Sequence, residues 1–321
     1  MNPGSGRGGR RPNVVALGGG HGLAVTLSAV SRYAGQVTAV VSAADDGGSS
    51  GRLRAWWEGP APGDIRRCLL ALAGNSQREK LWAEVLDHRF PAGELAGHSL
   101  GNLVLVGLAQ ATGDFVAATA ELAHLLGVTA RILPATSEAV ELCAEVGTAG
   151  GTTAELDGQA KLTRSVAPIV RVWLRPASPP APAEVLRAIE GADQVVLGPG
   201  SLFTSVLAVC AVPAIHEALA ARAGGRVYVC NLRPQDPETA GYDADAHLAA
   251  LRAHDVIVDA VICDPSTTVG CPAPPGRGRV HAAHAAPAVQ VVSAAVAGPS
   301  GHSHDPALLA RELEGLAARP A

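Results

Sequence analysis

The chain has 321 residues, of which 48% are hydrophobic and 17% are charged, and its formal net charge at pH 7 is −4. It is long enough to bury a substantial core, and this balance predicts a soluble globular protein without a charge excess that would attract nucleic acid. No apolar stretch reaches the roughly 18 residues of a membrane-spanning helix, and no apolar segment follows the N-terminal arginines, so we expect no membrane span and a cytoplasmic location.

Cysteine usage gives no sign of a disulfide framework or a zinc site. The six cysteines are scattered and include no CxxC pair. We therefore interpret all six as small buried apolar residues. They are Cys68, Cys143, Cys210, Cys230, Cys263 and Cys271.

Residues 1–12 are rich in glycine and arginine and lack periodicity, which predicts a disordered tail. We expect residues 13–321 to form a single α/β domain with a small β-rich insert at about residues 146–175.

A glycine-rich loop follows the first predicted strand, residues 14–17. The loop consists of Gly18, Gly19, Gly20, His21 and Gly22, and helical periodicity begins after it. A helix that starts in this way presents unpaired N–H groups and a partial positive charge, which suit a phosphate. The loop departs from the dinucleotide fingerprint GxGxxG, because Leu23 stands where the third glycine is required.

A second loop, with the adjacent carboxylates Asp45 and Asp46, follows the apolar residues 37–41. Two such groups repel each other unless a hydroxyl-rich ligand, a divalent cation or backbone N–H groups lie between them. The alternative is a solvated turn. The acidic pair lies where the second strand of a βαβ unit often binds a ribose hydroxyl, so we expect it to meet the glycine loop at one edge of a parallel sheet.

Polar residues at the start of two later helices are further candidates. Asp64 is in position to cap a helix, whereas Arg66 in its first turn opposes the helix dipole and requires an anionic ligand or a carboxylate partner. His98 and Asn102 precede and begin the apolar run 103–111, which predicts an interior helix with a polar start in a cleft. Residues 97–101 match GxSxG literally, but no apolar strand precedes them, and this disfavours an esterase.

The middle of the chain has strand signals. Residues 152–163, with Asp157-Gly158 at their centre, predict a hairpin with a type I′ turn, and residues 170–174 predict another strand. This β-rich insert is interpreted as a flap or an interface, and the pattern does not separate the two.

A second glycine loop follows the predicted strand 193–197. It contains Gly198, Pro199, Gly200 and Ser201, and we interpret it as a second anion-binding loop. Asn231 ends a further strand. After the predicted strand 258–262 the pattern is weak until a final helix at residues 306–317. The histidines of this part, His281, His284, His302 and His304, are interpreted as solvated.

Strands that alternate with helices predict an α/β fold with a mainly parallel sheet and helices on both faces. Ligands of such folds bind at the carboxyl ends of the strands, where both glycine loops, the acidic pair and Asn231 fall.

Together these motifs resemble the CofD/YvcK family, and more closely its YvcK branch of bacterial gluconeogenesis factors. The resemblance covers residues 13 to about 263, while residues 264–304 match poorly. His21 and Phe203 are mild departures. The motifs are GGGHG, ADDGGSSGRLR, PGDIRRCL, GHSLGNL, GPGSLFTS and VCNL.

The resemblance implies a Rossmann-like three-layer α/β/α fold. It also implies a cytoplasmic protein that binds a UDP-sugar, UDP-N-acetylglucosamine in known members, and that is needed for growth, cell shape and envelope integrity on gluconeogenic carbon. No reaction is established for that branch. The sister branch transfers a phospholactyl group from a nucleotide-activated donor, with Mg²⁺ and acidic residues at the position of Asp45 and Asp46.

Two functions therefore compete. In a nucleotide-sugar sensor, the two glycine loops hold the diphosphate and Asp45, Asp46 or Asn231 binds hydroxyls. A flexible segment then reports the bound state to a regulatory protein partner, and we also expect a homo-oligomer. In a transferase, Asp45 or Asp46 ligates Mg²⁺ while an acceptor hydroxyl attacks. The resemblance favours the sensor. A dinucleotide-dependent oxidoreductase is disfavoured by the incomplete fingerprint.

Overall fold

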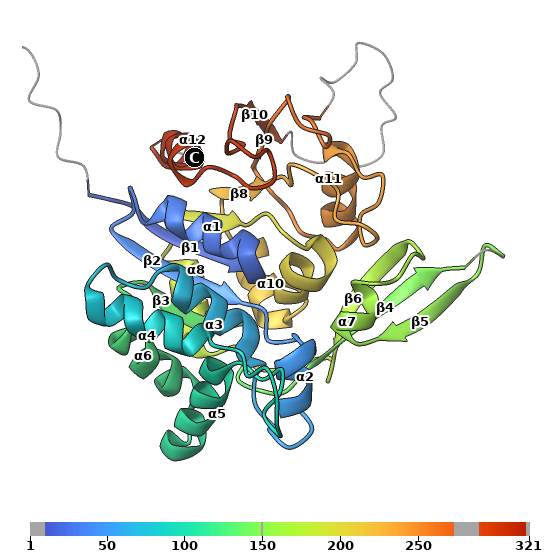
Figure 1. Ribbon diagram of the computed structural model, residues 1–321. Helices are drawn as coiled ribbons and strands as arrows, with labels where there is room; N and C mark the ends of the chain where they lie inside the picture. The colour runs from blue at the N-terminus through green and yellow to red at the C-terminus, as the bar shows by residue number, and fades with distance from the viewer. Residues whose placement is uncertain (1–9, 149, 273–288, 319–321) are drawn as a thin grey trace, which may run out of the picture.

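A seven-stranded sheet forms the centre of the molecule. The computed structural model describes residues 10–148, 150–272 and 289–318 (Figure 1). The strand order is β10-β9-β8-β7-β1-β2-β3. Every neighbouring pair is parallel, which confirms the predicted mainly parallel sheet. The strands are β1 (Asn13–Gly18), β2 (Gln36–Val41), β3 (Arg131–Pro134), β7 (Gln194–Leu197), β8 (Arg226–Val229), β9 (Ala260–Cys263) and β10 (Gln290–Ser293).

Helices cover both faces of this sheet, because its strands are apolar on both sides. Side chains of β1 alternate between the two faces: Val15 and Leu17 join one core, while Val14 and Ala16 join two smaller cores on the other face. The first core is completed by α8 (Ala183–Glu190), η1 (Leu202–Leu207), α9 (Ala208–Cys210), α10 (Pro213–Ala220) and α11 (Ala244–Ala253). The other two are completed by α1 (Gly20–Val30), α3 (Pro62–Ala71), α5 (Leu100–Thr112), α6 (Phe115–Leu125) and α12 (Pro306–Ala317). This is the expected three-layer α/β/α architecture.

Two further helices, α2 (Gly48–Leu53) and α4 (Gln77–Asp87), lie between these elements in the chain. The prediction that the run 103–111 is an interior helix is wrong in part. Its helix, α5, packs against α4 and α6, and Gly107 and Gln110 are exposed. The apolar residues fill one face only, since α5 lies in the outer layer.

A small antiparallel sheet stands out from the side of the main sheet (Figure 1). It has the order β5-β4-β6, with β4 (Glu141–Gly147), β5 (Thr153–Asp157) and β6 (Ile169–Arg175), and the short helix α7 (Gln159–Leu162) follows β5. The predicted hairpin turn at Asp157-Gly158 is wrong. The hairpin joins β4 to β5, and Asp157 pairs with Cys143 at its end. Gly158, with φ 100°, then turns the chain into α7.

The apolar side chains of the small sheet and α7 join the first core, and three hydrogen bonds also connect this insert to the main body. The Ala160 N–H donates to Asp46 Oδ1 at 2.7 Å, and Gln159 Nε2 donates to Thr204 Oγ1 at 3.4 Å. On the opposite side, the backbone N–H of Val172 donates to His254 Nε2 at 3.0 Å. The insert is therefore attached both to the acidic loop and to η1, which follows the loop after β7.

The interpretation of the cysteines is wrong for one pair. Cys263 and Cys271 form a disulfide, with a sequence separation of 8 and Cα atoms 5.2 Å apart, because the chain folds back after β9. The other four are free and buried, as expected. Strand β10, just before the final helix, was not predicted from the sequence.

The ends of the chain meet the expectations only in part. Residues 1–9 of the predicted disordered tail, together with His281 and His284, lie outside the described residues. Residues 10–12 contact the fold: Arg10 forms an ion pair with Asp193 at 2.9 Å, and the Gly35 N–H donates to the Pro12 carbonyl.

Within the described ranges no single helix has the length and hydropathy needed to cross a membrane. One bent pair, Leu202–Cys210 with Pro213–Ala220, passes that test jointly, at an angle of 79°.

A buried amide joins the sheet to two helical regions. Gln194, at the start of β7, is 1% exposed. Its Oε1 accepts a hydrogen bond from Tyr33 Oη at 2.5 Å, and its Nε2 donates to the Leu313 carbonyl at 2.9 Å. These contacts connect β7 to the segment after α1 and to α12.

We expect Gln194→Ala to lower the free energy of unfolding by about 2–3 kcal/mol, because it leaves a buried hydroxyl and a carbonyl without their partner. Urea unfolding measures the change. Gln110→Ala, at an exposed position of α5, is the matched control and should cost less than about 0.5 kcal/mol. Equal effects of the two substitutions would contradict the assigned role of Gln194.

Candidate functional site

The two glycine loops meet at the carboxyl ends of β1 and β7, where the order of the strands in the sheet reverses. They approach so closely that a Cβ atom at Gly22 would lie 1.9 Å from the carbonyl oxygen of Pro199. The Ser42 N–H donates to the Gly18 carbonyl at 2.9 Å, so the acidic loop begins beside them, as predicted. Open parallel sheets bind their ligands at this kind of switch point.

A cavity of about 330 Å³ is lined by both glycine loops, by the segment after β8 and by residues 302–304. Five of the candidate residues line it, namely His21, Gly22, Pro199, Gly200 and Asn231. Eight residues that the sequence did not single out as ligand-binding also line it: Val25, Leu232, Arg233, Pro234, Gln235, His302, Ser303 and His304. Residues 302–304 come from the poorly matching C-terminal part, so the cavity unites segments from both ends of the chain.

Asn231 fixes the second glycine loop. Its Nδ2 donates to the Gly200 carbonyl at 2.8 Å, and its Oδ1 accepts from the Gly200 N–H at 2.7 Å. The backbone here requires glycine, since Gly200 has φ 114°. Asn231 therefore shapes the cavity wall, and its amide is engaged with the protein itself.

His304 is buried, so the prediction of a solvated histidine is wrong at this position. Its Nε2 lies 3.1 Å from the Cys230 carbonyl, and burial lowers the pKa of His304 to about 4. The ring is thus neutral at pH 7 and donates to that carbonyl. His302 is exposed, as predicted.

The anion position of the second glycine loop is filled by the chain's own Glu238. This carboxylate, 6% exposed, accepts from the backbone N–H groups of Phe203 at 2.8 Å and Thr204 at 3.1 Å. Ser201 Oγ donates to it at 2.7 Å. Burial raises the pKa of Glu238, while these donors act in the opposite sense. The predicted anion-binding loop thus binds an internal carboxylate at these amides.

The adjacent carboxylates of the acidic loop point to different partners. Asp45 accepts from Ser50 Oγ at 2.9 Å and from the Gly47 N–H at 3.1 Å. Asp46 instead accepts from Ala160 at the start of α7. Donors from the protein therefore separate the two charges, which is one of the three arrangements expected from the sequence.

Arg66, His98 and Asn102 form a second cluster beside this loop, outside the lining of the 330 Å³ cavity. Arg66 forms an ion pair with Asp87 and donates from Nε to Asn102 Oδ1 at 3.1 Å. The sequence left open whether Arg66 meets an anionic ligand or a carboxylate partner, and the structure shows the carboxylate partner, Asp87.

His98 lies beside α2, with its Nδ1 3.1 Å from Ser49 Oγ. Burial and the nearby Arg52 and Arg89 lower the pKa of His98. The Ser99 hydroxyl donates to the Leu86 carbonyl at 3.2 Å and makes no cap bond to its own helix. This engagement agrees with the sequence argument against an esterase nucleophile.

Asp64 does not cap its own helix, contrary to the prediction, because Ala61 occupies the N-cap position of α3. It instead faces the first glycine loop, where a Cβ atom at Gly19 would lie 2.2 Å from Asp64 Oδ2 and the backbone N–H of Gly20 favours its charged form. Arg67 pairs with it. Burial nonetheless raises the pKa of Asp64 to about 6.

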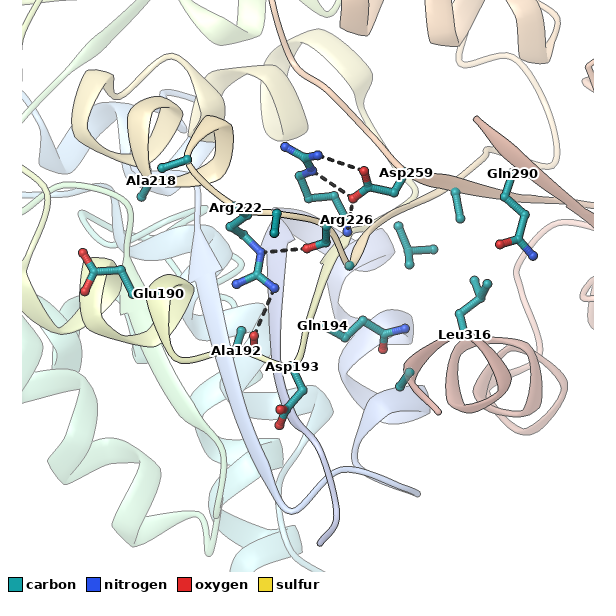
Figure 2. A pocket seen from close by; sticks show the side chains of 17 residues that line it. Glu190, Ala192, Asp193, Gln194, Ala218, Arg222, Arg226, Asp259, Gln290 and Leu316 are labelled. Atoms are coloured by element: carbon teal, nitrogen blue, oxygen red, sulfur yellow. Dashed lines mark hydrogen bonds and ion pairs between the residues drawn. The ribbon is translucent and has the colours of Figure 1, made fainter. Parts of the chain in front are cut away.

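A larger cavity, of about 720 Å³, lies at the opposite end of the sheet, where β7 and β8 begin (Figure 2). Both of its arginines already have partners within the protein. Arg226 donates to both carboxylate oxygens of Asp259, at 2.8 and 2.9 Å, and Arg222 donates to the Ala192 carbonyl at 3.0 Å. Its position at the amino ends of the strands makes it the weaker ligand site.

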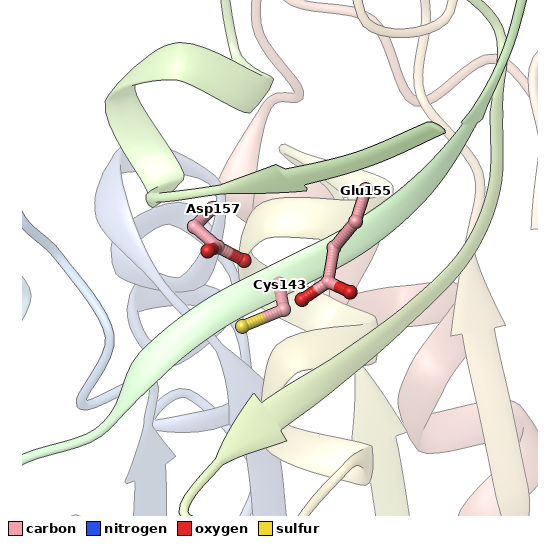
Figure 3. Close-up of side chains that lie close together, drawn as sticks. All are labelled: Cys143, Glu155 and Asp157. Carbon is pink, nitrogen blue, oxygen red and sulfur yellow. The ribbon is translucent and has the colours of Figure 1, made fainter. Parts of the chain in front are cut away.

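Cys143, Glu155 and Asp157 lie close together on β4 and β5 (Figure 3), and their ligand atoms are within 4.8 Å of one another. Arg175 pairs with Glu155 and, at 2.9 Å, with Asp157, so a cation is already present. Burial raises the pKa of Cys143 to about 12, and a protonated thiol is a poor metal ligand. We interpret the group as an ion-pair cluster.

The raised pKa of Asp64 makes stability depend on pH. The folded state holds this proton more tightly than the unfolded chain, so the free energy of unfolding falls as pH rises from about 4 to about 6. Asp64→Asn lacks this loss. We expect the free energy of unfolding of the variant, relative to that of the parent protein, to rise by on the order of 2 kcal/mol when the pH is raised from 4.5 to 7.5.

Urea unfolding at both pH values measures this difference. Glu94→Gln, at an exposed carboxylate, should show no such divergence. Parallel pH profiles for the parent protein and Asp64→Asn would refute the argument.

Comparison with known proteins agrees with this architecture. The family model described as 2-phospho-L-lactate transferase CofD matches residues 14–270. A crystal structure of a member of the UPF0052 family from Bacillus halodurans has a TM-score of 0.82 and 34% identity, and the alignment covers 95% of this chain and 99% of that one.

Curated relatives share a common name. The gluconeogenesis factor of Bacillus subtilis is 40% identical over 252 residues, which cover 77% of this chain and 76% of that protein. A relative from Mycobacterium tuberculosis, also named as a gluconeogenesis factor, is 43% identical over 322 residues, covering 95% of this chain and 90% of that protein. The chain therefore belongs to the CofD/YvcK family, together with the proteins named gluconeogenesis factors.

Proposed function

We propose that this protein is a cytoplasmic regulatory protein that binds a UDP-sugar, UDP-N-acetylglucosamine in the first instance, and supports growth, cell shape and envelope integrity on gluconeogenic carbon. The observation that carries the proposal is the 330 Å³ cavity lined by both glycine loops, at the switch point of the sheet. Nucleotides are bound at this point in Rossmann-like folds.

The start of α1 is the part of the cavity best suited to a phosphate. This helix has no side-chain cap, and its first internal hydrogen bond is donated by Leu23 to the Gly19 carbonyl. The N–H groups of His21 and Gly22 therefore have no partner within the helix and carry its positive dipole end. The hydroxyl-rich parts of the ligand would extend along the carboxyl edge toward Asp45 and Asp46.

The insert provides a route by which binding could be reported. Asp46 accepts a hydrogen bond from the first turn of α7, and Gln159 of α7 contacts Thr204 in η1, directly after the second glycine loop. A shift of either loop would therefore move the small antiparallel sheet. In this proposal residues 13–321 act as one domain, and the insert faces a regulatory protein partner or a second copy in a homo-oligomer.

A phospholactyl transferase is the second candidate, favoured by the description of the matching family model. It would need Mg²⁺ at Asp45 and Asp46. In the described part of the chain these two and Asp64 do not form a group of three with ligand atoms within 4.8 Å of one another. Because Asp45 and Asp46 are directed to separate donors, the observed arrangement does not fit a preformed magnesium site.

Calorimetric titration with UDP-N-acetylglucosamine, GDP and NAD, each with and without Mg²⁺, tests the proposal. We expect binding of the UDP-sugar without Mg²⁺, and mass spectrometry should recover the ligand intact. GDP binding that requires Mg²⁺, or a consumed ligand, would favour the transferase instead.

Asp45→Asn should weaken UDP-N-acetylglucosamine binding at least tenfold, about 1.4 kcal/mol. The amide replaces one of the two acceptor oxygens by a donor, so it cannot satisfy both Ser50 and Gly47 as the carboxylate does. Calorimetry measures the affinity, with Glu58→Gln, at an exposed carboxylate, as the control. Unchanged affinity of Asp45→Asn would remove the acidic loop from the site.

A further inference from the structure

The charge of a bound diphosphate needs a partner that the glycine loops do not fully supply. At the second loop, the N–H groups of Phe203 and Thr204 already bind Glu238. At the first loop, the Gly20 N–H faces Asp64. The amides at the start of α1 remain, and a helix terminus offers about half a unit charge. A diphosphate therefore calls for a nearby cation.

Arg233 is the one arginine or lysine among the described residues that line the cavity. It is exposed, and it follows β8 by only a few residues. The described residues include no carboxylate in an ion pair with it, whereas the buried or half-buried Arg66, Arg67 and Arg226 each have one. No aspartate or glutamate lines the cavity within the described ranges.

The guanidinium is already oriented. Arg233 Nε donates to the Gly301 carbonyl at 3.1 Å, which fixes the side chain against the turn that leads to His302. Among the described residues the hydrogen bonds of Arg233 involve Nε alone, so both terminal nitrogens remain as donors. Such a fork matches two phosphate oxygens, and prior orientation reduces the entropy lost on binding.

We propose that Arg233 binds the phosphate groups of the nucleotide ligand, opposite the start of α1, and so provides the charge selectivity of the cavity. The other side chains of the wall do not supply this charge in the same way. His304 is held neutral against the Cys230 carbonyl, and the amide of Asn231 is engaged with Gly200. This inference rests on the proposed nucleotide-sugar function.

Calorimetry on Arg233→Met and Arg233→Lys with UDP and with uridine tests the inference. Met keeps the aliphatic stem and removes the charge, whereas Lys keeps the charge and loses the fork. We expect Arg233→Met to weaken UDP binding at least tenfold and Arg233→Lys to weaken it less. Uridine affinity should be unchanged, since uridine carries no phosphate.

Salt provides a second readout. Raising ionic strength should weaken UDP binding to the parent protein more than to Arg233→Met, because the charged contact is screened. The control is Arg78→Met, at an exposed position of α4 far from the cavity lining, which should bind UDP as the parent does. Thermal midpoints of all variants should agree, since Arg233 is exposed.

The outcomes separate this inference from the proposed function. If the parent protein binds UDP and Arg233→Met binds it equally well, Arg233 is not the phosphate group's partner, and the proposed function stands. If Arg233→Met loses UDP and uridine affinity to the same extent, its role is structural and the inference fails. If the parent protein binds neither UDP nor UDP-N-acetylglucosamine, both fail.

Discussion

Internal carboxylates hold the carboxyl edge of the main sheet together. Backbone N–H groups at the ends of parallel strands need acceptors once they are buried, and the loops after β1 and β7 would otherwise leave several without one. Glu238 and Asp64 supply these acceptors from distant segments. The cost is that each carboxylate loses hydration, which is why the pKa of each is raised. In return the loops have fixed positions before any ligand arrives.

This constraint explains the shape of the cavity. Hydrogen bonds to Glu238 and Asn231 fix the second loop, and Pro199 lies in close contact with Gly22. The cavity therefore lies between α1 and the segment after β8. A preformed cavity with fixed walls binds without a large loss of conformational entropy. The same contacts reach the insert through Thr204 and Asp46, so the site and the small sheet share their supports.

The sequence predicts much of the fold because its strongest signals are local. Apolar runs such as residues 14–17 and 193–197 form strands, and a glycine loop follows each of them. Helices pack on both faces of the sheet that these strands build. What it could not predict depends on long-range pairing. The hairpin turn lies between β4 and β5 and not at Asp157-Gly158, because β5 pairs with β4. The chain also folds back after β9, which allows the disulfide between Cys263 and Cys271. Neither leaves a periodic pattern in the chain.

The candidate site divides in the same way. Sequence reasoning placed His21, Asn231 and the acidic loop at one edge, because the ends of parallel strands meet there. It could not assign Asp64 to the neighbouring loop, since a local cap explained that residue equally well. The importance of Glu238 and Arg233 was also hidden, because each acts on a segment far away in the chain. For Arg233 the available signal was a charged residue a few positions after a buried strand.

The wall formed by residues 302–304 has a consequence for biosynthesis. His21 and the first glycine loop leave the ribosome well before residues 302–304, which line the other side of the cavity. Domains fold as units while the chain is made. A nascent chain that has formed β1, β2 and β7 still lacks part of this wall, so the full cavity can form only after residues 302–304 have been made.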